Sequence, residues 1–189
     1  MGPTRLIAFT DGVIAVIITI LVLELRVPQG ADFASLRPLA PVFAAYVLTF
    51  VNIGIYWNNH HHMMQAARKV DGRVLWANLA LLFSLSLTPF VIRWIDAVGV
   101  EPLPVAAYGL VMIMAALSYY LVELTLKLAE GADSQIRKAV GSQAKEWISL
   151  TGYCAGTVLA FLSPYISVAV YVLVSAWWFV PDRRFEHRL

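Results

Sequence analysis

Six apolar segments constrain this chain more than any other feature, and they lie at about residues 6–25, 39–57, 74–95, 103–126, 147–162 and 165–180. A helix needs roughly 20 apolar residues to cross the hydrocarbon core of a bilayer, and the first four segments reach that length. The last two are shorter, and Ser163-Pro164 between them predicts a helical hairpin with a tight turn. We therefore expect an all-α integral membrane protein with six transmembrane helices, forming a single domain over residues 1–189.

The composition supports a membrane protein and excludes several other classes. Hydrophobic residues make up 60% of the chain and charged residues 14%, whereas a typical soluble domain has about 25% charged residues. The net charge is only +2, with no basic face interleaved with exposed aromatics, so nucleic acid is not an expected partner. Membrane lipids are the expected partners instead. No pairing of the Ser-His, Glu-x-x-His or His-Glu-x-x-His kind supports an enzyme.

Basic residues are distributed unequally between the two sides of a six-span arrangement. Only Arg26, Arg37 and Arg93 fall on one side. The other side carries Arg5, Arg68, Lys69, Arg73, Lys127, Arg137, Lys138, Lys145, Arg183, Arg184 and Arg188. The positive-inside rule then predicts a multi-pass protein of the cell membrane with both termini in the cytoplasm. Residues 128–146, within the more basic side, are expected to form either an amphipathic helix on the membrane surface or a solvated loop.

The start of the first helix carries the most specific motif in the chain. Arg5-Leu6-Ile7-Ala8-Phe9-Thr10-Asp11 resembles the Arg-x-x-x-Phe-Ser-Asp signature that opens the first helix of the transmembrane protein 175 family of potassium channels, with Thr10 in place of Ser. Thr keeps the hydroxyl group, so the hydrogen-bonding capacity is retained. Trp57 and His60 are similar to the Trp-x-x-His end of the family's second helix, and Asn78 fits a polar position in its third.

This resemblance implies a function and an assembly. A single six-helix unit is typical of the family's prokaryotic branch, which implies a homotetramer with the first helix lining a central pore. The resemblance also implies passive permeation of potassium ions, no cofactor, and a polar network that holds the first helix to its neighbours. The expected members of this network are Arg5, Phe9, Thr10, Asp11, Trp57, His60 and Asn78.

Helical geometry places an apolar stripe on the first helix. At about 100° per residue, Val16, Ile20 and Leu23 fall within about 60° of one another, and Thr19 lies about 40° from Leu23. Asp11 points about 140° away from Val16 and should face the interior of its own subunit. The resemblance implies that the stripe closes the pore as a hydrophobic gate and that Thr19 contributes to cation selectivity, although Val16 stands where Ile or Leu is usual. From the stripe alone, ordinary helix packing remains an alternative.

A small secondary transporter or proton-coupled carrier is the alternative function, since Asp11, Glu24 and the run His60–His62 are ionisable groups within or beside apolar segments. Such groups cost about 2.5–3.5 kcal/mol each in a membrane and need a structural or functional reason. A metal site at the histidines is not expected, because adjacent residues of a helix point about 100° apart and cannot hold one ion together.

Two further patterns concern packing within the helices. Thr88-Pro89 lies inside the third segment, where proline removes a backbone hydrogen bond and predicts a kink. Gly152 and Gly156 form a Gly-x-x-x-Gly pair in the fifth segment, which permits close approach of another helix within or between subunits.

Overall fold

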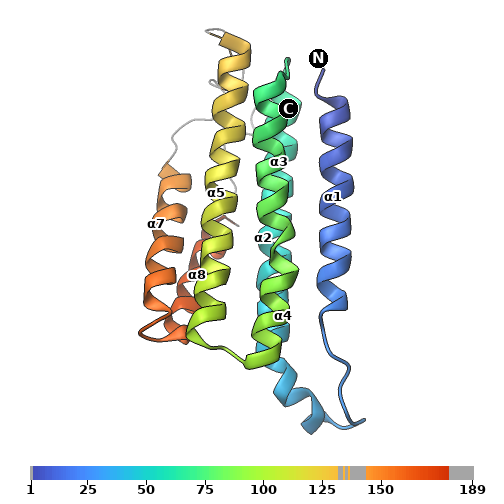
Figure 1. Ribbon diagram of the computed structural model, residues 1–189, viewed down its shortest axis with the longest axis vertical. Helices are drawn as coiled ribbons and strands as arrows, with labels where there is room; N and C mark the ends of the chain where they lie inside the picture. Colours follow the sequence, from blue (N-terminus) through green and yellow to red (C-terminus); the bar gives the residue numbers. More distant parts are fainter. Residues whose placement is uncertain (1, 132–133, 135, 137–143, 179–189) are drawn as a thin grey trace.

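The computed structural model describes residues 2–131, 134, 136 and 144–178, and in these residues the chain forms helices and connections without a β-strand. The elements are α1 (Thr4–Leu23), the 3-10 helix η1 (Phe33–Leu39), α2 (Ala40–Ala66), α3 (Gly72–Ser86), α4 (Thr88–Val98), α5 (Pro102–Glu130), α7 (Ala144–Leu159) and α8 (Pro164–Trp178). The helices run along the long axis of the molecule, with α1 at one edge and α7 at the other (Figure 1). The predicted all-α architecture is confirmed, with the third span divided into α3 and α4.

Among the described residues, four stretches of helix are long and apolar enough to cross a membrane: α1, η1 with α2, α3 with α4, and α5. Helix α8 is apolar but shorter. It pairs with α7 as the predicted hairpin, because Pro164 starts a new helix after the turn at residues 160–163. Helix α2 continues well past the apolar segment, since Trp57 and the three histidines extend it to Ala66.

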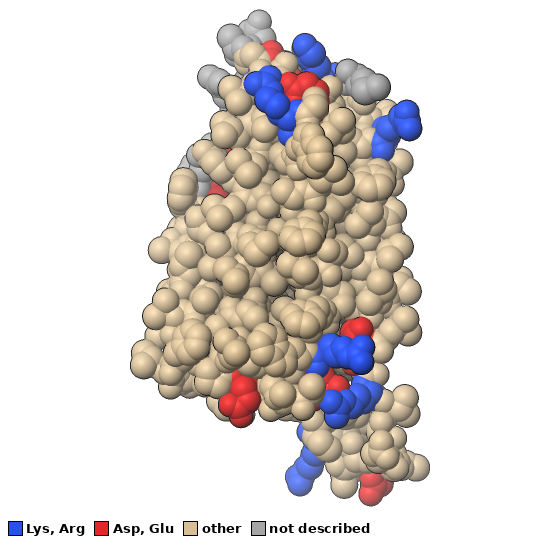
Figure 2. All heavy atoms as spheres, in the orientation of Figure 1, with Lys and Arg blue, Asp and Glu red and all other residues tan. Residues whose placement is uncertain are grey.

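We refer to the two ends of this bundle as the Arg5 end, where α1 begins, and the Arg93 end, where α4 finishes. Figure 2 shows charged side chains mostly near these two ends, with a broad uncharged zone between them. That zone is what a helix bundle presents to the hydrocarbon core. The basic residues Arg137, Lys138, Arg183, Arg184 and Arg188 lie outside the described residues. So does most of the predicted surface helix or loop at 128–146.

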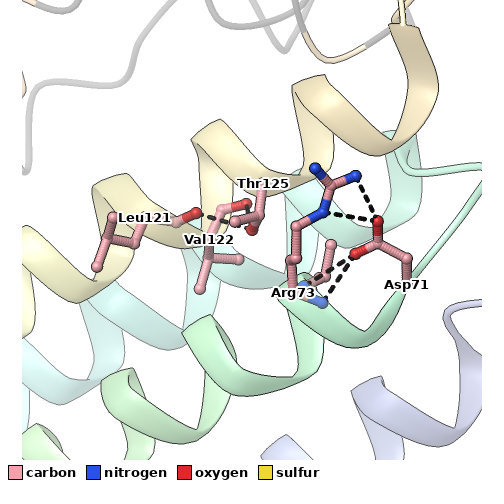
Figure 3. Close-up of polar contacts among 6 residues, drawn as sticks. Asp71, Arg73, Leu121, Val122 and Thr125 are labelled. Atoms are coloured by element: carbon pink, nitrogen blue, oxygen red, sulfur yellow. Dashed lines mark hydrogen bonds and ion pairs between the residues drawn. The ribbon is translucent and has the colours of Figure 1, made fainter.

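The start of α3 is fixed by a side-chain cap. Asp71 accepts hydrogen bonds from the backbone N–H groups of Arg73 and Val74 at 3.0 and 3.2 Å, and the Arg73 guanidinium donates to the same carboxylate at 2.8 Å (Figure 3). The hydrogen bond from the Arg73 side chain, together with those from the backbone, holds the pKa of Asp71 below its ordinary value. The cap is exposed, and it ends the α2–α3 connection at the Arg5 end.

The third span is interrupted where Thr88-Pro89 predicts a kink. Helix α3 ends at Ser86 and α4 begins at Thr88. Proline at position 89 has no N–H to donate to Leu85, and the Thr88 hydroxyl donates to that carbonyl instead, at 2.8 Å. The Leu85 carbonyl therefore keeps a hydrogen-bond partner despite the break.

Glycines let α5, α7 and α8 pack closely. A Cβ at Gly156 would lie 2.4 Å from Cε1 of Tyr171, and a Cβ at Gly152 would lie 2.5 Å from Cγ2 of Val174. Gly109 of α5 meets the same tyrosine, with its Cβ position 2.1 Å from the phenol oxygen. The Gly-x-x-x-Gly pair thus serves packing of α7 against α8 within the subunit.

Candidate functional site

Helix α1 has one face packed into the bundle and one face turned away from it. The packed face contacts α2, α3 and α4. Its buried residues recur every three or four positions: Leu6, Thr10, Ile14, Ile17 and Leu21. The opposite face carries the sequence-predicted stripe, with Val16 56%, Ile20 42% and Leu23 75% exposed. The stripe is therefore not part of the packing core of its own subunit.

Thr19 lies on the same exposed face as the stripe. Its hydroxyl donates to the carbonyl of Ala15 at 2.8 Å, within its own helix. A hydroxyl bonded in this way keeps its lone pairs directed outward and can accept or coordinate there. Thr19 thus adds one polar group to an otherwise apolar face.

A buried chain of hydrogen bonds ties α1 to α2 and α3. The Asn78 amide nitrogen donates to the Thr10 hydroxyl at 2.8 Å, and Nε2 of His60 lies 2.9 Å from the Asn78 amide oxygen. Since the amide oxygen can only accept, Nε2 of His60 must carry the proton in this arrangement. All three side chains are buried, so the structure joins three of the residues that we expect in the polar network.

Asp11 is held by a second, separate contact with α2. The indole Nε1 of Trp57 donates to Oδ1 of Asp11 at 2.8 Å, and the Trp57 ring stacks on His61 with 5.7 Å between centroids. Asp11 is half-buried, and it lies on the flank of α1 rather than on the exposed stripe. Its carboxylate is thus directed at its own subunit, as the helical wheel predicts.

The structure leaves Arg5 and Phe9 outside these contacts. Phe9 is 53% exposed on the outward face of α1. Arg5 is exposed at the start of the helix and makes no hydrogen bond or ion pair with another residue that the structure describes. The reason is rotational, because Arg5 lies about 120° from Asp11 around α1 and cannot follow it toward Trp57.

The three histidines have different surroundings. His60 is buried in the chain with Asn78, whereas His61 contacts Trp57 and lies 2.8 Å from the Gln65 amide nitrogen through Nε2. Glu24 lies near the other end of α1, at about 1.5 Å per residue some 20 Å from Asp11. The ionisable groups of the alternative carrier mechanism are therefore not gathered at one depth.

Ion pairs at the Arg93 end hold α1 to α4, and sequence reasoning did not find them. Arg93 Nε lies 3.7 Å from Oε2 of Glu24. In a second pair the charges are exchanged between the two segments: the Arg26 guanidinium pairs with the Asp96 carboxylate and donates to the Asp96 backbone carbonyl at 3.1 Å. A signal was present in the sequence, since two carboxylates and two arginines close the first and third segments on the same side of the membrane.

Sequence reasoning also missed a polar centre among α2, α5, α7 and α8. Asn52 of α2 donates to the Tyr108 hydroxyl of α5 at 2.9 Å and accepts from the Ser175 hydroxyl of α8 at 2.8 Å. The Tyr153 hydroxyl of α7 lies 3.5 Å from the same amide oxygen. An asparagine inside the apolar segment 39–57 was the available signal, because such a group needs partners within the bilayer. The centre joins α2 to the three helices that α1 does not hold.

The chain is similar to known potassium-channel proteins along all or most of its length. The family model described as the endosomal/lysosomal potassium channel TMEM175 matches residues 5–89. A protein of Chryseobacterium sp. (strain P1-3) named as a potassium channel is 48% identical over 189 residues, which is 100% of this chain and 98% of that protein. A protein of Streptomyces collinus, also named as a potassium channel, is 28% identical over 193 residues, covering 92% of this chain and 90% of its own.

The fold has a relative among solved structures. The crystal structure of a Chamaesiphon minutus homolog of TMEM175, a lysosomal potassium-selective channel, superposes with a TM-score of 0.79. It covers 94% of this chain and 96% of its own, at 23% identity. The family model covers α1, α2 and α3 with their buried contacts, and the Chryseobacterium relative matches the whole chain. This chain therefore belongs to the TMEM175 family.

Proposed function

We propose that this chain is the subunit of a potassium-permeable channel that conducts ions passively across the cell membrane. The observation that carries this proposal is the identity of 48% along the entire chain with a protein named as a potassium channel. The match extends over all 189 residues, so it includes the region of α1 and of the helices packed against it. Enzymatic chemistry has no place in this function.

The permeation path requires more than one subunit. Val16, Ile20 and Leu23 face away from the bundle, so a path lined by these residues forms where copies of α1 meet around a common axis. We propose a homotetramer, as in the family's prokaryotic branch, surrounded by membrane lipids. The Arg5 end then lies in the cytoplasm, following the excess of basic residues there, and both termini share that side.

The proposed gate is hydrophobic. Rings of Val16, Ile20 and Leu23 narrow the path and exclude water, so that a hydrated ion cannot cross until the rings widen. Thr19 supplies the polar group at the same level, and selectivity arises when potassium sheds part of its water beside that hydroxyl. Asp11 stays outside the path because Trp57 holds its carboxylate against α2.

Planar-bilayer recording of the purified protein in asymmetric potassium and sodium tests conduction. We expect single-channel currents with a reversal potential shifted toward the potassium equilibrium value. Slow, saturable uptake without unitary currents would contradict the channel and favour the carrier.

The gate is tested by replacing Ile20 or Leu23 with asparagine. A polar ring lowers the barrier to water at the constriction, so Ile20→Asn and Leu23→Asn should raise the resting conductance. Leu110→Asn on α5 is a matched control, because Leu110 is 53% exposed but lies away from α1. Wild-type currents from both α1 variants, or an equal rise in the control, would contradict the gate.

A further inference from the structure

Helix α1 is attached to the third span at two places, one on each side of a break in that span. On the Arg5 side, Thr10 accepts from Asn78 of α3 at 2.8 Å. On the Arg93 side, Glu24 and Arg26 form ion pairs with Arg93 and Asp96 of α4. The two attachments therefore connect α1 to two separate helices, which meet at Leu87.

The break at Leu87 has the properties of a hinge. Backbone hydrogen bonding is locally reduced because Pro89 has no N–H, and the Leu85 carbonyl is bonded by the Thr88 hydroxyl. Sharp bends in helices occur at such positions, since no full ladder of backbone bonds must be broken there. Bending at Leu87 changes the direction of α4 while α3 stays bound to Thr10.

The ion pairs can transmit that bend to α1. The two pairs have opposite polarity. Glu24 and Arg26, at and just beyond the end of α1, supply one carboxylate and one guanidinium, and Arg93 and Asp96 of α4 supply the partner charges. A shift of one segment along the other would bring like charges together. The Asp96 side chain is 9% exposed and that of Glu24 19%, so both carboxylates are partly shielded from solvent. Glu24 directly follows Leu23, the last residue of α1, and lies about one turn from Ile20.

We propose that Glu24, Arg26, Arg93 and Asp96 are positioning residues that clamp the end of α1 to α4, so that the angle between α3 and α4 sets the width of the path at Ile20 and Leu23. This inference rests on the proposed function, since it requires α1 to line the path. The clamp holds the narrow state. Its loss frees the end of α1 and raises the probability that the path is open.

Charge reversal and charge exchange test the clamp in single-channel recordings. Arg93→Glu places a carboxylate against Glu24, and we expect the open probability to rise about two- to five-fold, the equilibrium change that an exposed ion pair can produce. The exchanged pair Glu24→Arg with Arg93→Glu should return it to within about two-fold of wild type. The reversal potential should not change, because Thr19 is untouched.

Arg37→Glu serves as the matched control. Arg37 lies on η1 at the same end of the bundle, and its side chain makes no ion pair within the described residues. A rise in the control equal to that of Arg93→Glu would indicate a general effect of surface charge. That result, a fall in open probability, or a failure of the exchanged pair to restore it would overturn the clamp.

Hydrogen exchange provides a readout that does not depend on conduction. In Arg93→Glu, backbone amides of residues 18–25 should exchange faster than in wild type, and the exchanged pair should restore their protection. Unchanged exchange in the single variant would overturn the clamp even if the currents changed. Wild-type protein without potassium currents would instead refute the proposed function, and the exchange result would still decide whether α4 restrains α1.

The hinge is tested by Pro89→Ala. Alanine restores an N–H that can donate to Leu85 and so stiffens the third span. We expect slower exchange at residues 87–91 and an open probability at least about two-fold below that of wild type. An open probability equal to that of wild type, with the exchange slowed, would show that bending at Leu87 does not control the path.

Discussion

Replacement of Asn78 by alanine should be among the most destabilising changes on the packed side of α1. Asn78 is the central member of the buried chain, donating to Thr10 at 2.8 Å and lying 2.9 Å from Nε2 of His60. Its removal leaves the Thr10 hydroxyl and the His60 N–H without a partner, and both side chains are at most 1% exposed. Water therefore has no ready access to replace the amide.

The expected cost follows from those two contacts. Hydrogen bonds between transmembrane helices contribute about 0.6 kcal/mol each on average, while a buried polar group left unpaired costs about 1–3 kcal/mol. For two such groups we expect Asn78→Ala to lower the free energy of unfolding by about 2–6 kcal/mol. Thr10→Val removes only the hydroxyl and keeps the side-chain volume, so its cost should be nearer about 1 kcal/mol.

The measurement is an unfolding titration with sodium dodecyl sulfate, followed by circular dichroism. Asn59→Ala is the control, because the Asn59 amide donates to the Ile55 carbonyl of its own helix at 2.9 Å and makes no hydrogen bond to another helix in the part of the chain that the structure describes. The double variant of Thr10 and Asn78 should cost less than the sum of the single variants, since both remove the same hydrogen bond. Equal costs for Asn78→Ala and Asn59→Ala, or strict additivity of the pair, would refute the account.

Two further predictions concern positions away from α1. Gly156→Ala places a Cβ 2.4 Å from the Tyr171 ring and should lower the unfolding free energy by about 1–3 kcal/mol in the same titration. Gly54→Ala should not, because among the described residues nothing beyond the local backbone of α2 lies within 4 Å of its Cβ position. Equal effects of the two changes would mean that α8 shifts freely. Asp71→Ala should destabilise the start of α3 near neutral pH. Because folding lowers the pKa of Asp71, its contribution is present above the unfolded pKa and is lost as pH falls through the folded value. In a pH series of thermal melts, the difference in stability between Asp71→Ala and wild type should therefore become smaller as the pH falls. Asp71→Asn should retain most of the cap, because asparagine also accepts hydrogen bonds at this position. A difference in stability that does not depend on pH would contradict the role of the charge.

Much of the fold was predictable because a bilayer imposes local requirements. The length of an apolar segment and the position of a proline determine the helix at that place in the chain, whatever its neighbours are. The structure confirms the hairpin predicted at Ser163-Pro164 and the interruption predicted at Thr88-Pro89. The extension of α2 was less predictable, because a run of five polar residues, Asn58 to His62, follows the apolar segment before the buried Met63 and Met64. The short η1 was also missed, because its seven residues include Arg37 and Pro38 and almost all of them precede the apolar segment that begins at residue 39.

The arrangement around α1 was predictable only in part. The helical wheel separates Asp11 from Val16 by angle alone, so the opposite directions of the two side chains could be inferred before any fold was known. The hydrogen-bond partner of each polar group could not be inferred in this way. Arg5 and Phe9 belong to the same motif as Thr10 and Asp11, yet both are exposed, whereas Trp57 bonds to Asp11 and Asn78 bonds to Thr10.

The sequence by itself determined that this chain crosses a membrane several times and that its first helix has an apolar face and a carboxylate on different sides. These properties depend on hydrophobic length and on a rotation of about 100° per residue, which are features of single helices. Only the tertiary structure decided that Arg93 meets Glu24, that Asp96 meets Arg26, and that Asn52 binds Tyr108 and Ser175. Those contacts depend on which helices are neighbours and at what depth, and no local rule of the chain specifies either.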